Sequence, residues 1–259
     1  MRKKIIEKRL GEIFLPISFF LGILVAWEAF VFIFNIPEYL LPKPTEIFSE
    51  IAKNLSSLLK HTGITMLEAA IGFLLGNTLG FIVAVIFSHS ETAEKGLYPY
   101  AIALKTTPIL AMAPLLVLWF GTGIISKIVA SAVVCFFPIL VNTVKGLKSV
   151  DKDYLDLLKS FSAKKHQIFI KLRLPNSLSY IFSALKISTG LAVVGAIVGE
   201  FVGAKEGIGF IILTSTYHLE TVKMFAAIIM SALGGILFFY LINLIEKYIV
   251  FWQKTENSF

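Results

Sequence analysis

The sequence is poor in charge and in cysteine. Only 16% of its 259 residues are charged, while 56% are hydrophobic. A soluble domain carries about a quarter charged residues, so this composition is typical of an integral membrane protein and excludes an ordinary soluble enzyme. The single cysteine, Cys135, excludes an intrachain disulfide.

Motifs for catalysis, metal binding and nucleotide binding are also missing. The four histidines are scattered without ligand spacing. There is no G-x-S-x-G, no H-E-x-x-H and no G-x-x-x-x-G-K-[ST]; the nearest stretch, GTGIISK at Gly121, lacks the phosphate-loop spacing. We therefore expect no catalytic residue, no metal site and no cofactor in this chain.

Six apolar runs are each long enough to cross a bilayer as a helix, which is the form that satisfies the backbone in lipid. They lie at 14–34, 64–87, 98–120, 124–144, 184–204 and 224–250. The first is too long for a signal-peptide core, so we take it as a retained span. Between the first two, residues 35–63 form an external segment that contains an amphipathic helix, with Thr45 as its cap. The fold class is all-α integral membrane with six transmembrane helices.

The basic residues predict the orientation. With the N-terminus inside, sixteen of the 24 Lys and Arg residues lie in cytoplasmic segments and six in external ones, Lys127 among the six. Both termini, 1–13 and 251–259, are then cytoplasmic. The net charge of +7 is explained as a topology signal, so no nucleic-acid partner is indicated.

Small and polar residues within the spans indicate packing faces and a candidate solute pathway. Glycines recur every four residues in the second and fifth spans, a spacing that lets another backbone approach closely: Gly72, Gly76, Gly80, Gly195, Gly199 and Gly203. The candidate pathway residues are the ionisable Lys105 and Glu200, together with Pro108 and Pro114, which remove backbone donors and must distort the third span.

The loop at 145–183 is too polar to span a bilayer, yet it is patterned. Tyr154, Leu157, Leu158 and Phe161 follow the i, i+3, i+4, i+7 spacing of one apolar helix face. A Ser162-Ala163 corner follows, then a second helical piece that we expect to end at Leu174-Pro175. An amphipathic helix on anionic lipid has a similar pattern, but the corner favours a docking element for a partner.

This loop resembles the cytoplasmic loop of ABC importer permeases, which reads E-A-A, three residues, G, nine residues, I-x-L-P. Aligned on Leu174-Pro175, Leu172 falls at the Ile position, Ser162 at the Gly position and Asp156-Leu157-Leu158 at E-A-A. The corner fits serine if its φ is negative, whereas a left-handed corner carries a cost. Five further stretches resemble the nitrate/sulfonate/taurine type of permease: LPKPTEIF, TTPILAMAPLLVLWFGTG, FFPILVNTVKGLKSVD, SFSAKKHQIFIKLRLP and VGEFVGAKEGIG.

The resemblance implies a permease of the MetI-like type in the bacterial plasma (inner) membrane, with a five-span core over 64–250. It implies these partners: two ABC ATP-binding subunits that bind ATP and Mg²⁺, an extracytoplasmic substrate-binding protein, membrane lipid, and a second, identical permease chain. The solute would be a small anion (nitrate, sulfonate, taurine or bicarbonate) or a thiamine-precursor pyrimidine or other vitamin. The residues that would couple to the ATPase are Tyr154, Asp156, Leu157, Leu158, Phe161, Ser162, Ala163, Lys164, Lys165, Leu172, Leu174 and Pro175.

Two other functions fit a polytopic chain. A secondary transporter would work without an ATPase, and would usually show inverted repeats with interrupted helices in matching positions. A membrane scaffold would not need the patterned loop. Dependence of uptake on ATP, or binding of an ATPase, separates these alternatives from an ABC permease.

Overall fold

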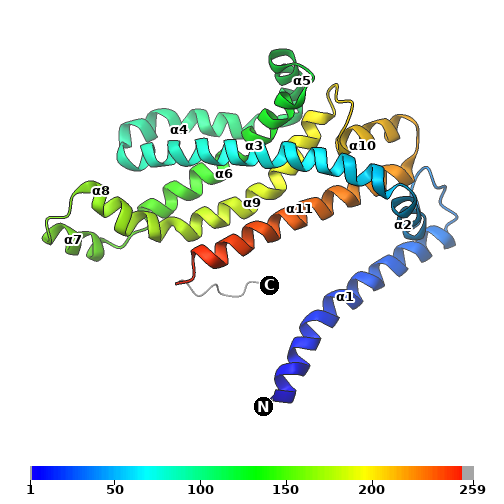
Figure 1. Ribbon diagram of the computed structural model, residues 1–259, viewed down its shortest axis with the longest axis horizontal. Coiled ribbons are helices and arrows are strands. Elements are labelled where there is room, and N and C mark those ends of the chain that lie inside the picture. Colours follow the sequence, from blue (N-terminus) through cyan, green and yellow to red (C-terminus); the bar gives the residue numbers. More distant parts are fainter. Residues whose placement is uncertain (1, 253–259) are drawn as a thin grey trace. The chain divides into compact units, whose positions relative to one another are not determined.

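A computed structural model describes the backbone of residues 2–252 and the side chains from Phe14 to Trp252; the predicted tail at 251–259 and the side chains of 1–13 lie largely outside this range. Every regular element in the described range is helical. The chain forms two compact units (Figure 1): unit 1 comprises Met1–Leu59 with Ile211–Ile229, and unit 2 comprises Lys60–Phe210 with Met230–Phe259.

Unit 1 contains the helix α1 (Arg2–Ile33), whose apolar part is Phe14–Ile33, and the short helix α2 (Pro44–Lys53). The Glu28 carboxylate on α1 accepts hydrogen bonds from Thr45 N–H (3.1 Å) and Thr45 Oγ1 (2.8 Å). A carboxylate is favourable at this helix start because the unpaired N–H groups carry partial positive charge. The prediction that Thr45 caps α2 is wrong, since the cap is Lys43 and Pro44 occupies the first turn.

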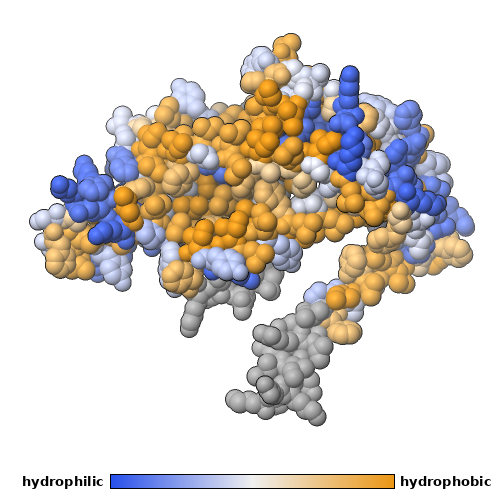
Figure 2. Space-filling model, in the orientation of Figure 1, coloured by the Kyte–Doolittle hydropathy of each residue, from blue (hydrophilic) through white to orange (hydrophobic). Residues whose placement is uncertain are grey.

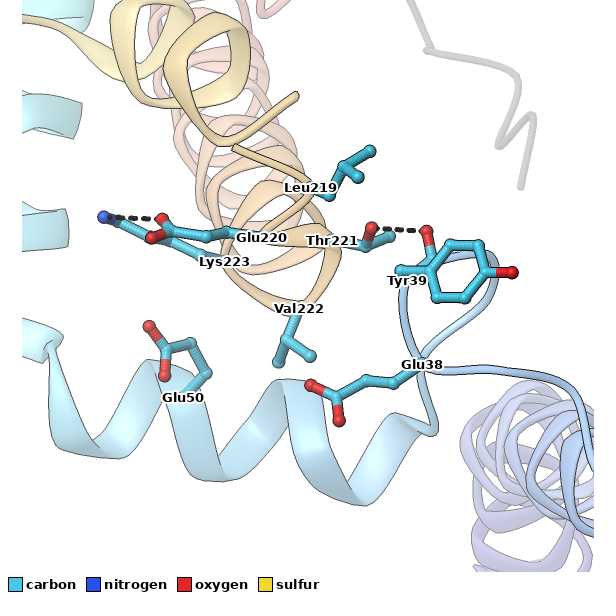
Figure 3. A pocket seen from close by; sticks show the side chains of 8 residues that line it. All are labelled: Glu38, Tyr39, Glu50, Leu219, Glu220, Thr221, Val222 and Lys223. Carbon is cyan, nitrogen blue, oxygen red and sulfur yellow. Dashed lines mark hydrogen bonds and ion pairs between the residues drawn. The ribbon is translucent and has the colours of Figure 1, made fainter. Parts of the chain in front are cut away.

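The rest of unit 1 includes the turn between α10 (Ile208–Tyr217) and α11 (Thr221–Ile249), together with the adjoining parts of both helices. Leu219 has a left-handed φ of 58°, and Glu220 N–H bonds back to Ser215 O at 2.9 Å. Figure 3 shows the cleft beside this turn, about 540 Å³ in volume, which Glu38 and Glu50 line together with the Glu220–Lys223 ion pair.

Three long helices of unit 2 pack through glycine faces: α3 (Leu55–His89), α6 (Ile124–Lys148) and α9 (Leu174–Glu200). A Cβ atom at Gly76 would overlap the carbonyl oxygen of Ala132 on α6, and Gly72 and Gly80 are equally close to α6. On α9, a Cβ at Gly195 would lie 2.7 Å from Ser131 Cα. Helix α6 is therefore packed by both glycine faces, and Figure 1 shows the three helices side by side.

Two boundaries differ from the prediction in this packed region. Helix α3 begins at Leu55, nine residues before the predicted second span, and takes up the last part of the predicted external helix. Helix α9 ends at Glu200, so Gly203 lies beyond the helix in a turn with φ 73° and is not a member of the glycine face. Glycine is needed there for its backbone conformation.

The third span is broken. Helices α4 (Glu91–Thr106) and α5 (Ile109–Phe120) meet at an angle of 98°. Pro108 stands at the break, where its missing N–H and fixed φ end the helical ladder. The predicted distortion is thus found at Pro108 and not at Pro114, because α5 continues through Pro114.

The loop between α6 and α9 contains α7 (Lys152–Ser160) and α8 (Lys165–Ile168). The prediction that the second piece ends at Leu174-Pro175 is wrong. A π-helical turn, η1 (Phe169–Arg173), joins α8 directly to α9, with Leu174 N–H bonded to Phe169 O. The wider turn gives the Pro175 ring room that a regular helix lacks.

Among the residues that the structure describes, five helices are long and apolar enough to cross a membrane, or six spans are present when α4 and α5 count as one. Within unit 2, Figure 2 shows hydrophobic residues along the long helices and hydrophilic ones gathered at the end with α7 and α8. All six predicted spans correspond to helices, which agrees with an all-helical membrane protein.

Candidate functional site

The first candidate site is the surface of α7, which leaves apolar side chains without partners in the described chain. Asp151 caps α7 by accepting Asp153 N–H at 3.0 Å. Tyr154 is 61% exposed, Leu157 53% and Phe161 75%. We call these three residues, with the half-buried Leu158, the docking surface. Exposed apolar groups of this size on one short helix indicate a binding surface.

The helix α7 ends in a Schellman motif. Ser162 N–H bonds to Lys159 O at 2.8 Å, and Ala163 N–H bonds to Leu158 O at 3.0 Å. Ser162 itself has a φ of 56°, the left-handed conformation that glycine usually supplies at this position. The corner predicted from the sequence is thus left-handed, and serine carries its cost.

The other residues of the predicted coupling loop surround this corner. Lys164 and Lys165 are exposed at the start of α8, where Lys164 N–H donates to Gln167 Oε1 at 2.7 Å. Asp156 pairs with Lys159 at 2.8 Å on the exposed side of α7. Leu172, Leu174 and Pro175 are half-buried and belong to the continuous helix that leads into α9.

The second candidate site is a cavity of about 320 Å³ at the break between α4 and α5, which we call the bent-span cavity. Lys105, Thr106, Thr107 and Pro108 line it from the break. Its other lining residues come from α6 and α9 and include Val133, Phe137 and Leu191. The Lys105 Nζ lies 4.6 Å from the centroid of the Phe137 ring, a cation–π contact. Sequence reasoning missed the α6 and α9 residues, because apolar residues of separate helices carry no signal of a shared cavity.

Glu200 does not line the bent-span cavity. It is 1% exposed, accepts Thr65 Oγ1 at 2.7 Å, and accepts Gly209 N–H at 2.5 Å. Thr65 Oγ1 in turn accepts Ile208 N–H at 2.8 Å. Glu200 and Thr65 therefore satisfy the first N–H groups of α10, and a carboxylate is favourable at a helix N-terminus. A Cβ atom at Gly207 would overlap the Glu200 carboxylate, so glycine is required there.

Two further contacts hold the same segment. His61 Nδ1 accepts Gly207 N–H at 2.9 Å. Lys60 pairs with Glu206 at 2.7 Å, and this hydrogen bond lowers the pKa of the Glu206 carboxyl group below its ordinary value. The segment from Glu206 to Gly209 is thus fixed to the start of α3.

The burial of two charged residues in this region was not predicted: Glu68 was interpreted as a polar span residue that reaches the interface, and Lys127 as a loop residue. Lys127 was counted as an external loop residue, but it is 2% exposed in the first turn of α6 and donates to Gly123 O at 2.9 Å. The Glu68 carboxyl group, 4% exposed, faces Glu200, and Lys127 lies near both acids. A lone lysine after GTG in the sequence resembles a loop residue, so no local pattern indicated its burial.

The helical architecture with a broken span is that of a multi-pass membrane protein. The chain matches the family described as "Binding-protein-dependent transport system inner membrane component" over residues 76–250, and it belongs to this family. It is therefore an inner-membrane, multi-pass permease of an ABC importer, in which the ATPase is a separate subunit. The secondary-transporter alternative is set aside by this membership.

Similar proteins cover nearly the whole chain. The formylaminopyrimidine transport permease of Halalkalibacterium halodurans is 36% identical over 96% of this chain and 100% of that protein. The putative aliphatic sulfonates transport permease of Bacillus subtilis is 33% identical over 100% of this chain and 94% of that protein. A solved inward-facing MetNI methionine ABC transporter has a chain with a TM-score of 0.66 at 19% identity, covering 76% of this chain and 98% of that chain, which supports the MetI-like fold.

Proposed function

We propose that two copies of this chain form the solute pathway of an ABC importer, with both termini in the cytoplasm, and that α7 of each copy docks on an ATP-binding subunit. The observation that carries the proposal is the docking surface, whose three largest side chains are each more than half exposed. Full burial of one such side chain is worth about 1.5–3 kcal/mol. A surface of this kind, next to a fixed corner, suits a groove in a partner protein.

The arrangement around α7 supports a role in transmitting movement. The left-handed Ser162 fixes the direction in which α7 leaves α8, and η1 joins α8 to α9 without an interruption in the helix. A displacement of α7 by the ATPase would therefore reach the fifth span through continuous helix. Lys164 and Lys165 lie exposed beside the surface, where charge mainly affects the rate of association.

We further propose that the solute passes the bent-span cavity, with Lys105 and Pro108 on the pathway. Irregular backbone at membrane depth is tolerated where it is buried in protein or lines a cavity, and the α4–α5 break lines one. Glu200 and Pro114, the other two sequence candidates, line no part of this cavity. The solute is a small anion, as the sulfonate permease suggests, or a pyrimidine or vitamin, as the formylaminopyrimidine permease suggests.

Co-purification with the cognate ATP-binding subunit tests the docking proposal. Phe161→Ala removes the most exposed apolar side chain of the docking surface, and Ala163→Asp places a charge at the corner. We expect each variant to lose most of the bound ATPase. Lys152→Ala is the matched control, because this exposed residue lies on α7 outside the docking surface, and it should retain the ATPase.

Unchanged ATPase binding by Phe161→Ala and Ala163→Asp would show that α7 is not the docking element. Circular dichroism and gel filtration of each variant distinguish lost docking from lost folding.

A further inference from the structure

Lys105 is an exposed cation in the broken apolar span, and it has no counter-ion among the residues that the structure describes. It is the next-to-last residue of α4, which places it roughly 21 Å along the helix from Glu91, whereas a bilayer core is about 30 Å thick. In the part of the chain that the structure describes, no carboxylate pairs with Lys105, and its ammonium group lies over the Phe137 ring. Ionisable residues within spans are costly and usually face a bundle interior or a water-filled cavity.

The surroundings of Lys105 favour negative charge. Helix α5 begins at the break with Pro108 as its N-cap and no side-chain cap. The N–H groups of Ala111 and Met112 bond to Pro108 O, which leaves those of Ile109 and Leu110 as donors at the start of α5. The hydroxyl groups of Thr106 and Thr107 both donate to Ala103 O, at 3.0 Å and 2.9 Å, and so supply no proton to a solute. The positive groups that remain are the lysine ammonium and the start of α5.

The remainder of the cavity wall is apolar. Val133 and Phe137 line it from α6 and Leu191 lines it from α9. A volume of about 320 Å³ holds a small solute together with some of its water. The wall therefore offers one charged anchor and an apolar surface beside it.

We propose that the bent-span cavity is an anion subsite, in which Lys105 binds the charged group of a small sulfonate-like or carboxylate-like solute and Phe137 contacts its apolar part. This inference rests on the proposed function, because it places the subsite on the importer's pathway. It selects the anionic class from the two solute classes that the relatives suggest.

Charged thiol-reactive reagents test whether the cavity prefers anions, and they require no knowledge of the natural solute. The variant Val133→Cys places a small thiol in the cavity wall, while the native Cys135 is fully buried and gives the background rate. The probes are sulfonatoethyl methanethiosulfonate, an anion, and its trimethylammonioethyl analogue, a cation. In both reactions the thiolate attacks the reagent, a disulfide forms, and methanesulfinate leaves.

Each reaction rate is first divided by the rate of the same reagent with a small free thiol. On this scale, we expect the thiol introduced by Val133→Cys to react about tenfold faster with the anionic reagent than with the cationic one. Lys105→Gln should remove the preference and Lys105→Arg should keep it. Tyr217→Cys is the control, because Tyr217 is an exposed residue of α10. In this variant, Lys105→Gln should leave the ratio of the anionic to the cationic rate unchanged.

Three results would overturn the inference: no reaction at Val133→Cys, no preference for the anionic reagent, or a preference that survives Lys105→Gln. Nanodiscs of phosphatidylcholine with and without phosphatidylglycerol separate a solute from a lipid headgroup. If phosphatidylglycerol abolishes the preference, Lys105 holds lipid and the inference fails. None of these measurements uses the ATPase, so their outcome is distinct from that of the docking test.

Discussion

At the scale of single residues, Ser162 holds a conformation that suits glycine better. A left-handed backbone costs a non-glycine residue roughly 1–2 kcal/mol, and Ser162 has a φ of 56°. We expect Ser162→Gly to stabilise the end of α7 by about 1 kcal/mol. Hydrogen exchange should show slower exchange of the Ala163 amide, which bonds to Leu158 O.

Ser160→Gly is the matched control for this prediction. Ser160 belongs to α7 itself, where glycine costs about 0.5–1 kcal/mol relative to good helix formers. We expect this variant to speed up exchange of the same amide. Faster exchange in Ser162→Gly would contradict the strained corner.

The sequence predicted the exposed apolar face of α7 better than the surroundings of the polar residues within the spans. The spacing of Tyr154, Leu157 and Phe161 was sufficient to predict one exposed apolar face. Glu200 was correctly marked as unusual in a span, but its partners Thr65 and Gly209 come from other helices of the chain. A sequence cannot show which polar groups will meet, so a structural contact was taken as a pathway candidate.

At the scale of helices, the glycine faces set the distance between α3 and α6. A Cβ at Gly76 would overlap backbone atoms of Ala132, and backbone cannot rotate away as a side chain can. We expect Gly76→Ala to destabilise the protein by roughly 1–3 kcal/mol, the usual cost of overpacking. Thermal unfolding in detergent should show a lower midpoint.

Gly96→Ala is the control substitution. Gly96 is also helical, in α4, but a Cβ there would meet nothing within 4 Å. Helix propensity alone then favours alanine by about 1 kcal/mol. Equal losses of stability from both variants would indicate that close packing is not the reason for Gly76.

The ion pair between Lys60 and Glu206 gives the segment before α10 a pH dependence. Because Lys60 lowers the pKa of Glu206, the ionised carboxylate stabilises the folded chain above its ordinary pKa of about 4.3, and this contribution is lost as the pH falls through the lowered value. We expect Lys60→Gln to move the Glu206 titration upward. Carboxyl ¹³C NMR of labelled glutamate would measure the shift, and an unchanged midpoint would contradict the pairing.

The ends of helices were predicted less well than their existence. The rule that helices end before proline failed at Leu174-Pro175, because the π turn supplies a local solution that the rule does not contain. The rule held at Pro108, where the span does break. The two prolines differ in their tertiary surroundings, and a sequence pattern does not predict those surroundings.

At the scale of the whole molecule, six apolar runs were enough to predict the membrane architecture. Each run became a helix or a broken helix, since a helix pairs the backbone polar groups of an apolar run within the run itself. The orientation prediction is less secure than the span prediction, because it counts basic residues as loop residues. Lys127 was counted in this way, but it is buried in α6.

The proposed assembly contains two permease chains. We expect purified permease alone to hydrolyse no ATP, because the sequence has no phosphate loop. Native mass spectrometry of the reconstituted importer should give two copies of this chain with two ATPase subunits. A complex with a single copy of this chain would contradict the homodimer. It would not affect the docking proposal, which the co-purification experiment tests separately.

The continuous helix from α8 through η1 to α9 also fixes a rotational phase between its two ends. A π turn holds one residue more than the regular winding that it replaces, so removing one residue from Phe169–Arg173 would restore regular winding and largely keep this phase. Removing one residue from the regular part of α9 would instead turn everything before it by about 100° about the helix axis and advance it by about 1.5 Å. The docking surface would then point to another side while each local contact within α7 survived. The number of regularly wound residues after η1, more than their composition, therefore decides the direction in which a displacement of α7 reaches the fifth span.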